Sequence, residues 1–445
     1  MNFINYPNIN SQNFYKVFIF SIFSLLPISF VFGNLAININ IIIVDLSLII
    51  YSLKFNDWKW TKDNFFKLLL IIQFYLIANS IYGIFFSTNY EFFNNYHKQL
   101  TYNEVIYDGL YRSLGFIKFI LLVFSFSLLG KFGIRLENLI KVWSTIILII
   151  LFDVFFEKIF GNNIIGNISP DRTRIISFFG TEMIVGAYLL LFGFIISSYW
   201  IDIKNIKYSY KIFFNFLIVI VPFAIFASGE KSNFFKSILI FSILFYFIPI
   251  DKLVINKKKL ILILIVSLIS LFSFHDYTKI KYKTFYKRIF NQDNNKILDF
   301  STIRYFNHYE AAWNIFKDNP TLGIGNKNFR WHCHKPKYFN KEKKLSQSRC
   351  STHPHQVHFE LLSEQGVLGY ILILGILLNF LIKIVINSYK KNEILKFSLS
   401  IYLIIFLIPL LPGGGIFSTT SGANFWLAIA LLNYLINKKK NKKLI

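Results

Sequence analysis

The chain has 445 residues, of which 54% are hydrophobic and only 16% are charged, with a formal net charge of +25. Soluble domains carry about 25% charged residues, so this composition excludes a soluble protein. It also excludes nucleic acid as the reason for the basic charge, because the cytoplasmic loops of membrane proteins are rich in Lys and Arg and no RNA-binding motif is present.

Apolar runs long enough to cross a bilayer core of about 30 Å recur along the whole chain. The first run lacks a basic n-region and an A-x-A cleavage site, so we expect it to be retained as a helix. We predict an all-α membrane protein with about twelve transmembrane helices and a long, partly helical periplasmic loop before the tenth. The predicted spans are 14–33, 35–53, 65–86, 111–129, 138–160, 183–200, 212–228, 232–250, 259–274, 366–387, 395–411 and 416–436.

Basic residues gather in the connections that follow the even-numbered spans and in the C-terminal tail "NKKKNKKLI". The positive-inside rule places these connections and both termini in the cytoplasm. The long connection lies on the other side and holds seven of the eight histidines and both cysteines. We therefore expect three parts: an N-terminal membrane region over 1–274, a periplasmic loop over 275–365, and a C-terminal membrane region with a basic tail over 366–445.

Two candidate sites precede the long loop. In "SPDRTRIISFFGTEMIVGAYL", Arg172 and Arg174 lie at the outer end of the sixth span, with Glu182 nearby. Arginine binds phosphate in a bidentate way, so the pair suits a diphosphate; snorkelling boundary residues are the alternative. In "FASGEKSNFFKS", Lys231 points to the same compartment, although a single Lys at a membrane surface is ordinarily an anchor.

The first half of the long loop contains "STIRYFNHYEAAWNIFKDNPTLGIGNKNFRW". Its spacing predicts an amphipathic helix that carries Arg304 and Glu310 and ends at Pro320. Gly323 and Gly325 follow in a glycine-rich turn. Such turns can hold anions, but a single G-x-G without a surrounding Rossmann pattern favours ordinary turn chemistry.

The second half ends in "STHPHQVHFELLSEQGVLGY". Pro354 suits the first turn of a helix, which would place His355 and His358 one turn apart near its N-terminus. The helix dipole disfavours an imidazolium there, so His355 would stay neutral and fits a general base. Polar residues at a membrane interface are the alternative.

The cysteines lie in "WHCHKP" and "SRCSTHPHQVH". Together with nearby histidines they could supply zinc ligands, but their spacing matches no usual zinc pattern. A Cys333–Cys350 disulfide, two free thiols and a metal site therefore remain open.

Four stretches, taken together and in this order, resemble one family: "RTRIISFFGTEMIVGAYL", "SGEKSN", "RYFNHYEAAWNIFKDNPTLGIGNKNF" and "HPHQVHFELLSEQGVLGY". The chain resembles the O-antigen ligase and O-antigen polymerase-like membrane proteins of bacterial surface polysaccharide assembly. The resemblance implies transfer of a glycan from a polyprenyl diphosphate carrier to an acceptor, which is lipid A-core or a growing glycan. It also implies a site on the periplasmic face of the inner membrane that uses no metal or other cofactor.

The resemblance also implies roles for individual residues. His355 would deprotonate the acceptor hydroxyl and give an inverting displacement, while Arg174 and Arg304 would hold the diphosphate. His355-Gln356 stands where the family usually has His-Asn, and Glu230-Lys231 stands where it tends to have Arg. The remaining expected catalytic or substrate-binding residues are Arg172, Lys231, Glu310, His353, His358 and Glu360.

Other functions compete with a ligase. A polymerase of the same class differs mainly in its acceptor, and some members of the family attach glycans to proteins. A transporter of lipid-linked sugars would carry charges near mid-membrane, as Asp45 and Asp153 do, but no internal repeat is present and the ionisable residues gather in the long loop. A scaffold or receptor role is the last alternative.

Overall fold

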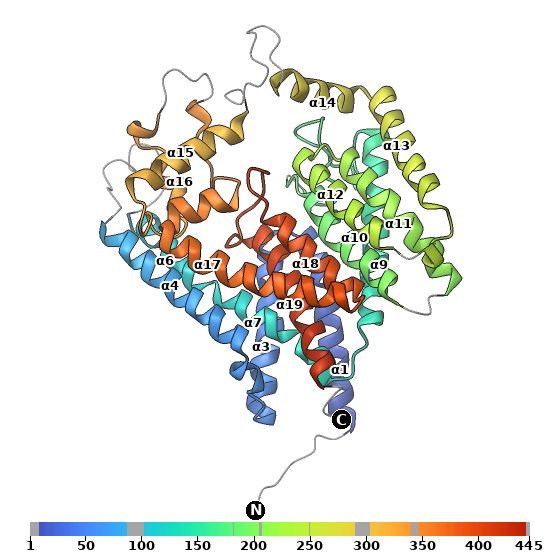
Figure 1. The fold of residues 1–445 in the computed structure, drawn as a ribbon, viewed down its shortest axis with the longest axis horizontal. Coiled ribbons are helices and arrows are strands. Elements are labelled where there is room, and N and C mark those ends of the chain that lie inside the picture. The colour runs from blue at the N-terminus through green and yellow to red at the C-terminus, as the bar shows by residue number, and fades with distance from the viewer. Residues whose placement is uncertain are drawn as a thin grey trace, which may run out of the picture.

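The computed structural model describes residues 9–86, 102–180, 182–203, 207–248, 250–289, 303–339 and 346–441, and these ranges contain helices and no strand. The α-helices are α1 (Ile9–Ser24), α2 (Leu26–Val31), α3 (Asn34–Phe55), α4 (Asn64–Phe86), α6 (Tyr102–Leu114), α7 (Ile117–Ser125), α8 (Ser127–Lys131), α9 (Leu136–Phe160), α10 (Val185–Asp202), α11 (Tyr208–Ala227), α12 (Lys231–Phe247), α13 (Lys257–Phe274), α14 (Asp276–Ile289), α15 (Arg304–Asp318), α16 (Phe329–His332), α17 (Val357–Lys390), α18 (Ile394–Phe406) and α19 (Thr419–Asn441). Figure 1 shows their arrangement.

Helices lie at all twelve predicted span positions. Within the described ranges, eight are long and apolar enough to cross a membrane, and the count reaches nine if α13 and α14, which meet at 93°, form one span. α12 and α18 are shorter, with 17 and 13 residues. The prediction of an all-α polytopic membrane protein is confirmed, and the number of twelve spans stays a prediction.

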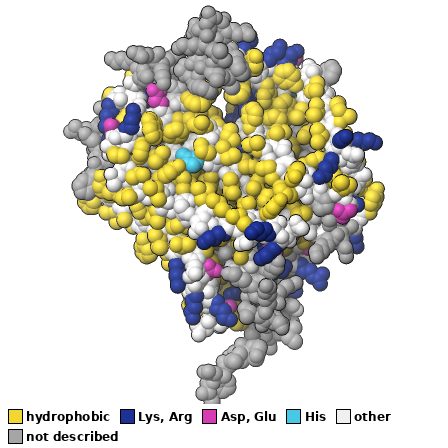
Figure 2. All heavy atoms as spheres, in the orientation of Figure 1, with side chains coloured by type: hydrophobic (Ala, Val, Ile, Leu, Met, Phe, Trp, Pro, Cys, Tyr) yellow, Lys and Arg dark blue, Asp and Glu magenta, His cyan; other side chains and the backbone are white. Residues whose placement is uncertain are grey.

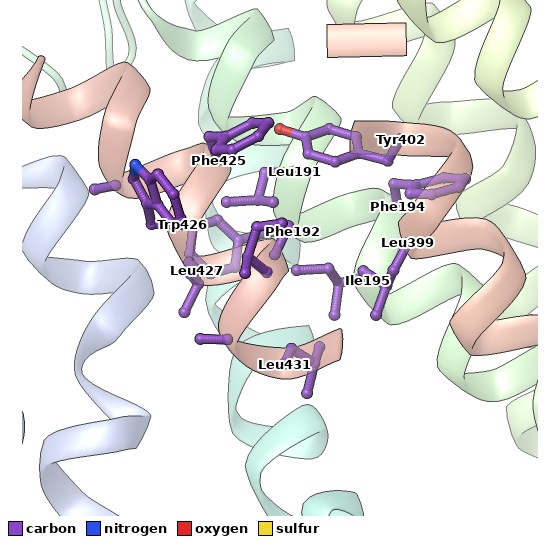
Figure 3. Close-up of a cluster of buried hydrophobic side chains, with 14 of the residues drawn as sticks. Leu191, Phe192, Phe194, Ile195, Leu399, Tyr402, Phe425, Trp426, Leu427 and Leu431 are labelled. Atoms are coloured by element: carbon purple, nitrogen blue, oxygen red, sulfur yellow. The ribbon is translucent and has the colours of Figure 1, made fainter. Parts of the chain in front are cut away.

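The core of the bundle surrounds α10, which is apolar on every face and almost completely buried. A helix of that kind belongs in the interior of a protein. Figure 3 shows side chains of α10 packed against side chains of α18 and α19. The labelled side chains are Leu191, Phe192, Phe194 and Ile195 of α10, Leu399 and Tyr402 of α18, and Phe425, Trp426, Leu427 and Leu431 of α19.

The outer surface is apolar as well. Large side chains such as Ile42, Phe152 and Val266 point away from the bundle and remain exposed. In Figure 2, hydrophobic side chains cover a broad area of the visible face, while many of the Lys and Arg side chains lie toward its edges. Continuous apolar surface of this extent marks a membrane-facing protein.

α17 is kinked at Gly366, where the backbone leaves helical geometry with φ 65°. The glycine-rich turn after α15 docks at this kink: Ile324 and Gly325 donate backbone hydrogen bonds of 3.1 and 3.0 Å to the carbonyl groups of Ser363 and Glu364. A Cβ on residue 366 would overlap the carbonyl group of Thr321, so only glycine fits. The turn interpretation is confirmed, because these N–H groups bind α17 rather than an anion.

Candidate functional site

A polar cavity of about 390 Å³ lies between the N-terminus of α15 and the segment that precedes α17. It is lined by Arg304, Tyr305, His308, Ser348, Cys350, Ser351 and His355. Arg304 and His355, which the sequence places about fifty positions apart, therefore meet in one site. The side of the cavity away from α15 belongs to a loop that has almost no regular structure of its own.

His355 does not lie in the helix that the sequence predicts for it. α17 begins at Val357, and the side chain of Gln356 caps it by accepting a hydrogen bond of 3.1 Å from the N–H of Phe359. The expected helix start at Pro354 was therefore wrong by three residues. His355 adopts the left-handed region, with φ 59°, because the chain turns sharply before the cap.

Two contacts hold His355 in this position. Its ring Nε2 lies 2.9 Å from the hydroxyl of Ser351, and its carbonyl group accepts a hydrogen bond of 2.7 Å from the N–H of Gly413. Gly413 belongs to the connection between α18 and α19. The two last helices of the bundle thus help to place the histidine of the long loop.

Three aromatic neighbours surround the imidazole of His355. The ring centroids of His353, Tyr305 and His308 lie 4.2, 5.3 and 5.4 Å from its own. His308 was not predicted, although it lies one helical turn after Arg304 and so shares its face of α15. That spacing was the available signal. Ser351 was missed as well, and no sequence pattern marked it.

Burial favours the neutral form of the imidazoles of His308, His353 and His355. Burial, with smaller contributions from His353 and His308, lowers the pKa of His355 to about 3. Burial, reinforced by Lys327 and Arg330, lowers the pKa of His353 to about 3, and burial also lowers the pKa of His308. The lowered pKa of His355 agrees with the sequence prediction of a neutral imidazole. Its cause is burial rather than a helix dipole, since His355 precedes the first residue of α17.

These shifts predict that the protein loses stability in mild acid. The pKa values of His353 and His355 are lower in the folded chain than the ordinary value near 6.5, so the unfolded chain binds more protons below that pH. Their stabilising contribution is complete above about pH 6.5 and is lost as the pH falls toward 3, by about 2 kcal/mol for each residue at pH 5. Thermal unfolding of the detergent-solubilised protein from pH 8 to pH 5 measures this loss.

The double variant His353→Gln/His355→Gln serves as the comparison in that titration. Its melting temperature should depend much less on pH than that of the unmodified protein. Equal pH dependence in the two proteins would show that the two imidazoles are already exposed to water when folded.

His308 has a defined tautomer. Its Nδ1 lies 2.8 Å from the carbonyl oxygen of Arg349. A carbonyl group only accepts, so Nδ1 carries the proton and Nε2 keeps its lone pair. Because the ring lines the cavity, the site contains a second imidazole that can accept a proton.

Three of the predicted site residues lie elsewhere. His358 is in the first turn of α17, with its ring nitrogens 2.9 Å from the hydroxyl of Tyr370 and 2.7 Å from the carbonyl oxygen of Leu407. Glu310 is half-buried farther along α15 and does not line the cavity. Glu360 is buried and forms an ion pair with Lys327. The side chains of His358 and Glu360 thus contact other residues of the protein, whereas Arg304 lines the cavity.

Arg172, Arg174 and Lys231 belong to a second basic group, which we call the outer cluster. Its two segments are joined by a hydrogen bond of 3.1 Å from the N–H of Ile175 to the carbonyl oxygen of Ser228. Arg174 donates to the carbonyl oxygen of Met183 at 2.7 Å, and its buried Nε has no hydrogen-bond partner.

Of the other two members of the outer cluster, Lys231 contacts α14 and Arg172 is exposed to solvent. Lys231 lies 4.2 Å from the ring centre of Phe285 on α14. Lys281, also on α14, forms an ion pair of 2.9 Å with Asp171. Burial alone would raise the pKa of Asp171, but hydrogen bonds from Thr173 and Lys281 lower it to about 2. The outer cluster therefore combines arginines with an ionised carboxylate.

Cys333 and Cys350 form a disulfide with their Cα atoms 5.3 Å apart. The disulfide alternative is the one that the structure shows; a metal would require the reduced thiols, and the ligand atoms of Cys333, His334 and Cys350 lie within 4.8 Å of one another. The bond joins the end of α16 to the cavity wall, since Cys350 lines the cavity. It fixes the segment that carries Ser351 and His355 to the body of the loop.

Comparison with known proteins adds one match. Residues 214–374 match the family model described as O-antigen ligase. This stretch runs from α11 into α17 and contains the entire cavity together with Lys231, while Arg172 and Arg174 precede it. No curated protein matches the chain.

Proposed function

We propose that the chain, whose residues 214–374 match the O-antigen ligase family model, is a membrane glycosyltransferase that moves a glycan from a polyprenyl diphosphate carrier to an acceptor hydroxyl. We place the reaction on the periplasmic face of a bacterial inner membrane, with both termini in the cytoplasm. The observation that carries the proposal is the meeting of the Arg304 guanidinium and the neutral imidazole of His355 in one polar cavity.

The reaction needs a proton acceptor and a cation. The acceptor oxygen attacks the anomeric carbon of the glycan, the bond from that carbon to the phosphate oxygen breaks, and the diphosphate leaves with the electron pair. The proton of the acceptor hydroxyl passes to His355. Arg304 stabilises the charge that develops on the leaving diphosphate, which is the kind of electrostatic help that contributes most in a site shielded from water. A single displacement of this kind inverts the anomeric centre.

Binding of the donor also prepares the base. The pKa of His355 is low in the empty site because of burial and the two neighbouring histidines. A diphosphate placed in the same cavity would favour the imidazolium and raise that pKa. His355 thus becomes a competent base when the anion is in place. We assign the outer cluster to attraction of the carrier's negative charge, because its arginines lie on the segment that precedes α10.

The test uses purified protein in lipid nanodiscs with EDTA, a polyprenyl-diphosphate-linked oligosaccharide and lipid A-core, with products separated on a gel. We expect lipid A-core to gain glycan, and Arg304→Gln to lose at least about 100-fold in rate. Arg135→Gln is the matched control, because Arg135 is an exposed arginine at the start of α9. A ladder of carrier-linked chains would instead indicate a polymerase. Absence of transfer to lipid A-core, glycan or peptide would overturn the proposal.

A further inference from the structure

α12 carries a buried ammonium group at Lys236. The side chain is only 3% exposed and points into the bundle, where its Nζ lies 5.4 Å from the ring centre of Phe406. Among the described residues, its Nζ has no charged partner and no hydrogen-bond partner. A buried lysine ordinarily has a charged partner, because an isolated charge in the interior is strongly unfavourable. An unpaired one inside a membrane protein therefore suggests a ligand.

The backbone beside Lys236 is made of glycine. The connection between α18 and α19 reads "PGGG" over 412–415, and a Cβ on Gly413 would lie 2.9 Å from the Nζ of Lys236. The hydroxyl of Ser232, one turn earlier in α12, donates to the carbonyl group of Pro412 and fixes the loop against this helix. In Figure 1 this loop, coloured dark red, rises between α12 and the part of the fold that holds α15 and α17.

The same loop contacts the candidate active site. The N–H of Gly413 donates to the carbonyl group of His355 at 2.7 Å. Only the backbone of the 412–415 loop therefore lies between Lys236 and the segment that carries His355. Within the part of the chain that the structure describes, the N–H groups of Gly414 and Gly415 donate no recorded hydrogen bond. Gly415 packs against the carboxylate of Glu360, whose charge is already matched by Lys327. Unused N–H groups in a glycine loop beside an ammonium provide donors for an anion.

We propose that Lys236 and the 412–415 loop form a phosphate-binding site that holds part of the donor's diphosphate next to His355. This inference rests on the proposed function for the identity of the ligand. The chemistry alone specifies a phosphate group, which a carrier diphosphate or an anionic lipid headgroup can supply. Lys236 contributes a point charge, and the N–H groups of Gly414 and Gly415 contribute backbone donors.

The test replaces Lys236 with Met, which keeps the length of the side chain and removes its charge. We expect the melting temperature of the variant to rise by about 2–4 °C, because an unpaired buried charge has been removed. The KM for the donor should rise at least tenfold, and the affinity for glycan-free polyprenyl diphosphate should fall by a similar factor. A lysine with a merely structural role would change the melting temperature without changing either quantity.

Lys118→Met is the matched control, because Lys118 is a half-buried lysine of α7 with a partner of its own, the side-chain oxygen of Asn38 at 2.7 Å. It should lose stability and keep its donor affinity. Gly413→Ala is the second variant and places a methyl group against the ammonium, so it should weaken donor binding while leaving the charge in place. If Lys236→Met does not fold, Gly413→Ala alone decides the proposal.

The outcomes separate this inference from the proposed function. Binding of polyprenyl diphosphate, inorganic diphosphate and phosphatidylglycerol is measured for each variant. Loss of the first two in Lys236→Met and Gly413→Ala supports the inference, even if the unmodified protein transfers no glycan. Loss of phosphatidylglycerol alone would make the site a lipid site and overturn its assignment to the donor. Transfer with an unchanged donor KM in both variants would overturn the inference and leave the proposed function intact.

Discussion

His355→Ala is expected to lower the rate of glycan transfer by about 10²–10⁴-fold, because it removes the group that takes the acceptor proton. The loss should appear mainly in kcat, since Arg304 remains to bind the diphosphate. The measurement is the nanodisc transfer assay at saturating donor, with insertion and melting temperature recorded for the same preparations. His275→Gln is the control: His275 lies between α13 and α14, and its Nε2 contacts the carbonyl oxygen of Lys158 at 3.2 Å.

His308 makes this experiment more informative. Its Nε2 is free to accept a proton, and its ring lies 5.4 Å from that of His355. If His355 is the base, His308→Asn should reduce the rate far less than His355→Ala does. The reverse order would move the base to α15 and leave His355 with a positioning role. Equal and undiminished rates in both variants would contradict histidine catalysis altogether.

Glu360→Gln is expected to lower the free energy of unfolding by at most about 3–5 kcal/mol, because it removes the carboxylate paired with the buried ammonium of Lys327 and leaves Glu364 as the remaining acidic neighbour. Both side chains of this ion pair are 1% exposed. Lys327 itself is held in the left-handed region, with φ 62°, and its N–H donates to Glu364 at 2.9 Å. Thermal unfolding in detergent measures the effect.

The double variant Lys327→Met/Glu360→Leu separates a structural role from a direct one. Removing both charges should restore most of the lost stability, since replacement of a buried pair by apolar groups is often neutral. If the double variant is stable and still transfers glycan, Glu360 is a structural residue and the sequence-based expectation of substrate contact was wrong. A stable but inactive double variant would instead support that expectation.

The parts of the fold that depend on composition could be predicted from the sequence. Long apolar runs form helices wherever they occur, because the backbone must satisfy its own hydrogen bonds in lipid, and helices lie at all twelve expected positions. The start of α17 could not be predicted. A proline at residue 354 favours the first helical turn, but the amide of Gln356 caps the helix two residues later.

Some residues of the cavity could likewise be predicted from the sequence and others could not. Arg304 and His355 were identified from their residue types and their motifs, whereas His308 became visible only when α15 placed it on the same face as Arg304. Lys236 could not be predicted as a binding residue from the sequence, for another reason. A lysine in "NFFKS" resembles an ordinary boundary residue, and its isolation follows from the packing of α12 against α18 and the glycine loop, which no local pattern encodes.

The length of α17 determines where reactants can meet. The segment after the kink at Gly366 has 24 residues (367–390), which at a rise of 1.5 Å span about 36 Å, slightly more than a bilayer core of about 30 Å. If this segment crosses the membrane, as the proposed function requires, the cavity before it would lie at the height of the lipid headgroups. A donor and an acceptor anchored by lipid tails would then find each other by diffusion in two dimensions. The rate should follow their mole fractions in the bilayer, and added inert lipid should slow the reaction even when the volume of the sample is unchanged.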